Sequence, residues 1–97
     1  MAKIEAELYG NFDIILADLH STVMGGSKSA TLEESSDIIS GSTRCSIRAY
    51  ERYSYLGSGR VSMNVTLFQT DGRIFLSVMS TGGSQAVFFK INTIGEN

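Results

Sequence analysis

The sequence contains no proline, no tryptophan, one cysteine and one histidine among its 97 residues. One cysteine cannot form a disulfide within the chain, and one cysteine with one histidine cannot form a Cys/His zinc site. A chain of this length has room for a single domain, residues 1–97, with one hydrophobic core. These absences exclude a two-domain enzyme with a cleft between its domains. They indicate that packing stabilises the protein, within one copy or shared with a second.

Charged side chains are also scarce, at 19% of the chain, and the formal net charge is −2 without a run of one sign. Proteins that bind nucleic acid or acidic membranes usually carry a basic patch, so we expect neither partner. The chain does not begin with a basic segment followed by an apolar stretch, and no window approaches 18 uninterrupted apolar residues. We therefore expect a cytoplasmic protein that does not span a membrane.

The hydrophobic pattern predicts an α+β domain of two layers, with one N-terminal amphipathic helix on an antiparallel meander sheet. Apolar residues alternate over 2–9, as in a strand, and then recur at helical spacing from Phe12 to Val23. Asn11 is a suitable N-cap, and Gly25-Gly26 supplies a stop. Strands are predicted over 28–39 (with a bulge near Ser35-Ser36), 43–55, 60–70, 73–80 and 87–91, which gives the order β-α-β-β-β-β-β. Residues 86–94 also fit a helical stripe, which leaves a second interpretation of that segment.

Glycine-containing turns predict how the strands pair, because directly opposed residues share a face of the sheet. Asp71-Gly72 fits a type I′ turn and Gly57-Ser58-Gly59 a three-residue loop, while Gly41-Ser42 and Gly82-Gly83 predict two more tight turns. The predicted opposed residues are Asp37 and Ser46, Glu33 and Tyr50, Tyr53 and Met63, Ala49 and Leu67, Leu67 and Leu76, Phe68 and Phe75, and Val78 and Val87. In these registers the inward apolar face includes Cys45, Ile47 and Ala49.

The same registers predict an aromatic patch on the face that the helix leaves uncovered. Arg48, Phe68 and Phe75 fall in one row, and the other residues of this candidate site are Tyr50, Met79 and Phe88. A contiguous apolar area of this kind is typical of an interface or a groove. We expect a non-enzymatic interaction module that forms a homodimer through this face. The alternatives are a small apolar ligand bound there, and a fold in which residues after Ile91 return to cover the patch.

Three arginines, at positions 44, 48 and 52, share that predicted face. An arginine strip can bind a carboxylate or phosphate, which makes an anionic ligand an alternative partner. Cross-strand pairing with Glu33 and Asp37 explains the same pattern without a ligand. Stacking of Arg48 on Phe68 would be compatible with this second interpretation.

No other motif carries enough chemistry to assign a catalytic residue, a metal or a cofactor. His20 and Cys45 are a candidate base and nucleophile, so a small-molecule carrier or small enzyme with a pocket between helix and sheet is the alternative function. Cys45, however, is predicted to be an inert buried thiol, and no oxyanion-stabilising group is evident. The segment 25–29 lacks the glycine before lysine and the following helix of a phosphate loop. Adjacent glutamates 33 and 34 point to opposite faces and cannot form a carboxylate metal site with Asp37.

Three stretches of the chain, 44–54, 59–62 and 82–93, resemble a family of small bacterial proteins classed only as a domain of unknown function. The resemblance extends over most of the chain. It implies no activity, cofactor or catalytic residue.

Overall fold

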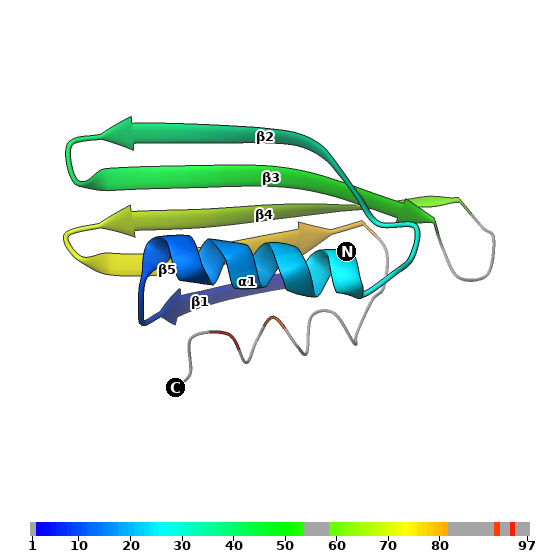
Figure 1. The fold of residues 1–97 in the computed structure, drawn as a ribbon, viewed down its shortest axis with the longest axis horizontal. Helices are drawn as coiled ribbons and strands as arrows, with labels where there is room; N and C mark the ends of the chain where they lie inside the picture. Colours follow the sequence, from blue (N-terminus) through cyan, green and yellow to red (C-terminus); the bar gives the residue numbers. More distant parts are fainter. Residues whose placement is uncertain (1, 54–58, 82–90, 92–93, 95–97) are drawn as a thin grey trace.

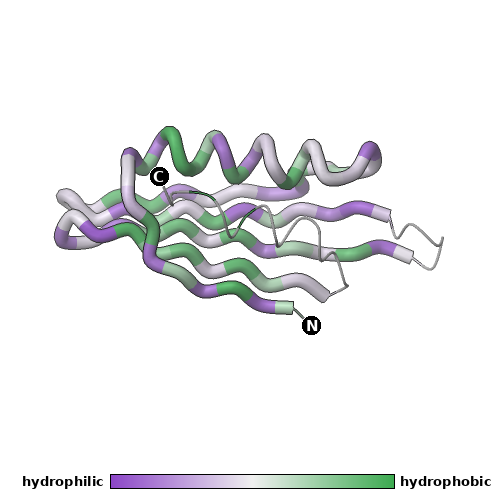
Figure 2. Tube along the Cα trace, turned by 90° about the horizontal axis from the view of Figure 1, so that it is seen from below, coloured by the Kyte–Doolittle hydropathy of each residue, from purple (hydrophilic) through white to green (hydrophobic). Residues whose placement is uncertain are grey.

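The computed structural model describes residues 2–53, 59–81, 91 and 94. Its elements are β1 (Ala2–Leu8), α1 (Phe12–Gly25), β2 (Thr31–Ser40), β3 (Thr43–Tyr53), β4 (Arg60–Thr70) and β5 (Arg73–Ser80). The strands form one antiparallel sheet in the order β1-β5-β4-β3-β2, and α1 lies on one side of it (Figures 1 and 2). The predicted two-layer α+β fold is confirmed.

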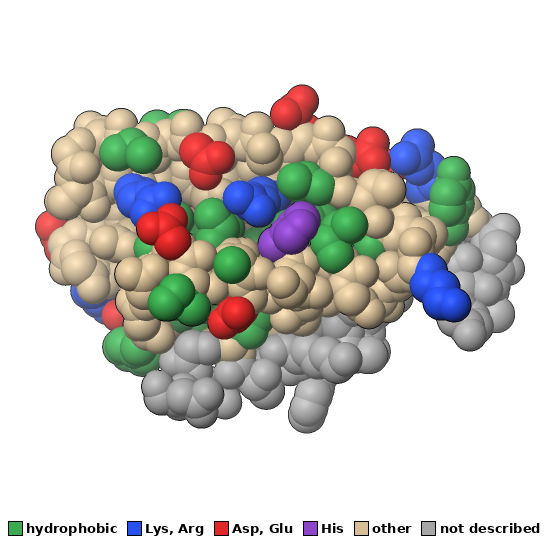
Figure 3. Space-filling view, viewed as in Figure 1, with side chains coloured by type: hydrophobic (Ala, Val, Ile, Leu, Met, Phe, Trp, Pro, Cys, Tyr) green, Lys and Arg blue, Asp and Glu red, His purple; other side chains and the backbone are tan. Residues whose placement is uncertain are grey.

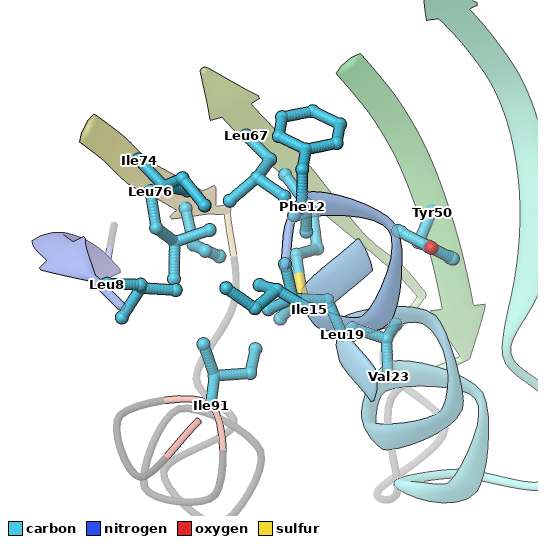
Figure 4. Close-up of a cluster of buried hydrophobic side chains, with 13 residues drawn as sticks. Leu8, Phe12, Ile15, Leu19, Val23, Tyr50, Leu67, Ile74, Leu76 and Ile91 are labelled. Atoms are coloured by element: carbon cyan, nitrogen blue, oxygen red, sulfur yellow. The ribbon is translucent and has the colours of Figure 1, made fainter. Parts of the chain in front are cut away.

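The helix begins and ends where the sequence predicts. The Asn11 side chain accepts a hydrogen bond from the backbone N–H of Ile14 at 3.1 Å, which satisfies one of the free donors at the helix start. The buried helical residues follow the predicted stripe and are Phe12, Ile15, Leu19 and Val23. They pack on the sheet in the cluster of Figure 4, together with Leu67, Leu76 and Ile91.

Two predicted turns are confirmed by the backbone. Asp71 and Gly72 have φ of 53° and 73°, as a type I′ turn requires, and Phe68 lies opposite Phe75. Gly41 has φ of 60° and joins β2 to β3 with Asp37 opposite Ser46. A bulge between Leu32 and Glu34 then changes the register, so that Leu32 lies opposite Tyr50. The predicted pairing of Glu33 with Tyr50 is therefore wrong, and the bulge falls earlier than expected.

The predicted register between β3 and β4 is also wrong. Tyr53 lies opposite Arg60, and Tyr50 lies opposite Met63, a shift of three residues from the predicted pairing of Tyr53 with Met63. The predicted register assumed a three-residue loop at Gly57-Ser58-Gly59, and residues 54–58 lie outside the described residues. A shift by an odd number moves every side chain of a strand to the other face. Cys45, predicted to be inward, thus faces away from the helix.

The edge of the sheet beside β5 is occupied by β1, with Ile4 opposite Val78. The predicted pairing of Val78 with Val87 is therefore wrong. Residues 82–90, including the Gly82-Gly83 turn, lie outside the described residues. Ile91 has helical backbone and is fully buried, and Ile94 packs against the core, in agreement with the second interpretation at these two positions.

Candidate functional site

The face of the sheet opposite α1 carries a row of apolar side chains across four strands. Ile38, Cys45, Phe68 and Phe75 are directly opposed in turn from β2 to β5. Ile38 is 58% exposed and Phe68 is 36% exposed. Within the described part of the chain no element lies on this side of the sheet (Figure 2). We call this surface the open face; its apolar residues are Ile38, Cys45, Ile47, Ala49, Phe68, Phe75 and Met79.

Ion pairs line the edge of the open face along β1. Arg73 donates to both carboxylate oxygens of Glu7 at 3.0 and 2.9 Å, and its guanidinium lies 5.1 Å from the centre of the Phe75 ring. These hydrogen bonds lower the pKa of Glu7 and raise that of Arg73. Lys3 pairs with Glu5 further along β1. The apolar row therefore ends at a charge-neutral border.

Two shallow hollows lie on the open face. One, of about 460 Å³, is lined by Phe68 and Phe75 with side chains of β1. The other, of about 210 Å³, lies around Ala49, Asn64 and Met79. Both are surface depressions, so protruding side chains of another apolar surface can pack into them.

The predicted site residues divide between the two faces of the sheet. Phe68, Phe75 and Met79 lie on the open face. Arg48 and Tyr50 lie on the helix side, because the corrected register of β3 reverses its side chains, and Arg48 therefore does not stack on Phe68. Phe88 lies outside the described residues. The sequence analysis did not assign Ile38, Cys45 and Ile47 to this face. It did place Cys45 and Ile47 on the same face of their strand, as the structure does.

On the helix side, Tyr50 connects the sheet to α1. Its hydroxyl lies 2.9 Å from Nδ1 of His20, and the residue is only 2% exposed. Burial raises the pKa of Tyr50, while the nearby Arg48 guanidinium opposes that rise. Either group can donate in the hydrogen bond between Tyr50 and His20, according to the tautomer of the imidazole ring. Figure 3 shows the histidine, in purple, at the surface among hydrophobic side chains.

The predicted pocket near His20 and Cys45 is not formed by the described residues. Cys45 lies on the open face and His20 on the opposite side of the sheet, so they cannot act as nucleophile and base. The hollow between α1 and the sheet, lined in part by Val23, Tyr50 and Val61, measures about 20 Å³. That is room for about one water molecule. The structure gives this alternative function no support.

Arg44 ties β3 to the start of α1. It donates to both carboxylate oxygens of Asp13 at 3.2 and 3.0 Å, and its guanidinium lies 4.1 Å above the Phe12 ring. The pair lowers the pKa of Asp13 and raises that of Arg44. Arg48 contacts Tyr50, and Arg52 donates to the carbonyl of Tyr53 at 3.3 Å. The three arginines thus contact groups of the protein, with Asp13 rather than a β2 carboxylate as the ion-pair partner of Arg44.

Among residues 2–53, 59–81, 91 and 94, no three His, Cys, Asp or Glu side chains are grouped to hold a metal ion. Over the same residues, no helix is long and apolar enough to cross a membrane.

The geometry defines a small α+β protein with one helix-covered sheet face and one apolar open face. The chain belongs to the family of unknown function DUF6054, whose family model matches residues 1–97. This confirms the resemblance to a domain of unknown function. No curated protein matches the chain.

Proposed function

We propose that this protein is a non-enzymatic interaction module that forms a homodimer through the open face of its sheet. The observation that carries the proposal is the row of Ile38, Cys45, Phe68 and Phe75, which crosses four strands and meets no described element. Burial of exposed apolar surface is the main driving force of association. The proposal includes a cytoplasmic location, in keeping with a single cysteine that leaves no internal disulfide.

The size of the open face supports a second copy as its partner. Five strands spaced about 4.8 Å apart, with about eight residues each, give a plan area of roughly 600 Å². The accessible area of a corrugated face exceeds its plan area. A stable dimer of standard size buries about 800 Å² on each partner. The face therefore has the dimensions of one half of a dimer interface.

The border supplied by Glu7 and Arg73 is neutral, so two copies related by a two-fold axis do not oppose like charges along it.

The single thiol on the open face is a reporter for this interface. Cys45 is partly exposed, so a maleimide reagent will reach it in the monomer and be excluded in the dimer. We expect its labelling rate to fall several-fold between about 1 µM and about 500 µM protein, a range that brackets micromolar association. Sedimentation equilibrium on the same samples should give the mass of two chains at the higher concentration.

A pair of charge substitutions tests the face itself. Phe68→Glu places a carboxylate in the apolar row, and Ile14→Glu places one at an exposed apolar position of α1. We expect the first to abolish the mass change and the concentration dependence of labelling, and the second to preserve both. A wild-type protein that sediments as a monomer at every concentration would overturn the proposal. Retention of a small apolar molecule by that monomer, visible in native mass spectrometry, would assign the face to a ligand instead.

A further inference from the structure

We propose that the outer edge of β2 binds an extended, basic peptide segment, which adds a sixth strand to the sheet. Addition of a strand to an exposed edge is a common mode of peptide recognition, in which backbone hydrogen bonds give affinity and alternate side chains give selectivity. The inference concerns the edge of the sheet. It is independent of what covers the open face.

The two edges of the sheet differ in exposure. All ten residues of β2 are exposed, whereas β1, at the other edge, alternates between exposed and partly buried residues and ends at the buried Leu8. The helix lies over the β1 side of the sheet and leaves β2 beyond its reach (Figure 1). Lys3 contributes the basic residue that commonly protects an edge strand, but β2 has neither lysine nor proline. The edge at β2 is thus long and exposed, and its charged side chains are acidic.

The backbone groups available at this edge follow from the hairpin geometry. In a two-residue turn the closing pair, here Ser40 and Thr43, exchanges both hydrogen bonds. Alternate residues of β2 therefore bond to β3, and Ser35, Asp37 and Ile39 turn their N–H and C=O groups outward. The N–H of Ser35 confirms this direction, because it donates to the side chain of Glu34 at 3.0 Å. A strand added here replaces that carboxylate with a peptide carbonyl.

The side chains of β2 determine the chemistry of the partner. The strand carries Glu33, Glu34 and Asp37 and no basic residue. Glu33 has a distant ion pair with Arg60, at 3.9 Å, while Asp37 and Glu34 form none with any residue that the structure describes. Asp37 points to the helix side and Ile38 to the open face. Glu34 shares the open face with Ile38, and Ile39 shares the helix side with Asp37. A segment that alternates lysine or arginine with an apolar residue can place its basic residues beside Asp37 and its apolar residues beside Ile38.

The same charges argue against β2 pairing with β2 of a second copy. Antiparallel self-pairing over the full length of β2 brings carboxylates of the two copies to neighbouring positions, and opposed or diagonal like charges destabilise a sheet. With Ser36 opposite its own copy, Asp37 is diagonal to both Asp37 and Glu33 of the other chain. Acidic side chains thus disfavour self-association at this edge and favour a basic partner.

The experiment compares two capped peptides of about eight residues, the length of a typical strand. One alternates lysine with valine, and the other alternates glutamate with valine. We expect the basic peptide to bind at least about tenfold more tightly in calorimetry, and less tightly as salt rises. Amide resonances of residues 34–39 should shift on binding, while those of β1 should not. Equal binding of the two peptides, no binding, or shifts confined to β1 would overturn the inference.

Two variants test the edge. Ser35→Pro removes one outward N–H without changing charge or the bonds to β3, and we expect a loss of affinity of at least about fivefold. Asp37→Lys keeps the backbone and, with Glu33 and Glu34 still present, should reduce the preference for the basic peptide several-fold. This variant keeps the inference testable if the proline variant does not fold. Phe68→Glu is the control and should bind the basic peptide as the wild type does. Retention of wild-type preference by Asp37→Lys would contradict the proposed role of charge.

Discussion

The two faces of the sheet differ in the partners that their side chains contact. On the helix side, polar groups of β3 meet partners from α1: Arg44 pairs with Asp13, and Tyr50 meets His20. On the open face, the apolar row around Phe68 meets no described element. The covered face follows the usual rule for a half-buried sheet, since Leu67 and Leu76 are buried beneath α1, whereas the uncovered face carries aromatic rings where polar side chains are usual. The helix-side contacts stabilise the fold, and the open face is the surface that we propose for association.

The largest expected effect comes from two neighbouring residues of β4 that point to opposite faces. Leu67 is fully buried beneath α1, and Phe68 belongs to the open face. We expect Leu67→Ala to lower the free energy of unfolding by about 3 kcal/mol, because it removes buried contacts and leaves a cavity. Phe68→Ala should cost less than about 1 kcal/mol in dilute protein, where no partner covers it.

Urea titrations of both variants at low and high protein concentration provide the measurement. The cost of Phe68→Ala should grow with concentration and that of Leu67→Ala should not, since only the first residue belongs to the proposed interface. Equal and concentration-independent costs would show that the two faces are buried alike in one copy of the chain.

A smaller effect is expected from the hydroxyl of Tyr50. Tyr50→Phe leaves Nδ1 of His20 without its hydrogen-bond partner and should cost about 1–2 kcal/mol. Tyr53→Phe, at an exposed position of the same strand, should cost less than about 0.5 kcal/mol. Because burial raises the pKa of Tyr50, the folded state holds the phenol proton more tightly than the unfolded state. Wild-type stability should therefore fall as the pH rises above about 10, the usual pKa of tyrosine, and part of this fall should disappear in Tyr50→Phe.

The smallest effect is expected at the exposed ion pair between Asp13 and Arg44. The pKa of Asp13 is lowered in the folded state, so the contribution of the pair is present above the unfolded pKa of aspartate and is lost as the pH falls through the folded pKa. Asp13→Asn should reduce the acid dependence of thermal unfolding below about pH 4. Asp18→Asn, on the same helix without an ion pair among the described residues, is the control. An identical acid dependence in the two variants would show that the ion pair between Asp13 and Arg44 contributes no pH-dependent stability.

The predictable parts of the fold depend on local sequence. Asn11, the apolar stripe and Asp71-Gly72 act within a few residues, and the helix and the β4–β5 hairpin were correctly predicted from them. The register of β3 was not predictable in the same way, because the strand has large apolar residues on both faces, Ile47 on one and Tyr50 on the other. The open face was consequently predicted with the right members from β4 and β5 and the wrong ones from β3.

The pairing of β1 with β5 could not be predicted from the local hydrophobic pattern. The alternation of β1 suits any antiparallel neighbour, and its partner β5 begins at Arg73, far along the chain. The run 87–91 alternates in the same manner, so periodicity alone could not decide which segment lies beside β5. Such a choice depends on the packing of the complete domain.

The place of β1 has a consequence for the order of assembly during synthesis. The strand made first has its hydrogen-bonding partner in β5, with Ala2 opposite Ser80, so it stays unpaired until most of the chain has left the ribosome. The hairpins of β2 through β5 can form earlier, since each joins neighbours in sequence. Completion of the sheet thus requires Leu8 to meet Ile74 across the intervening helix and hairpins, and this non-local contact favours slow folding.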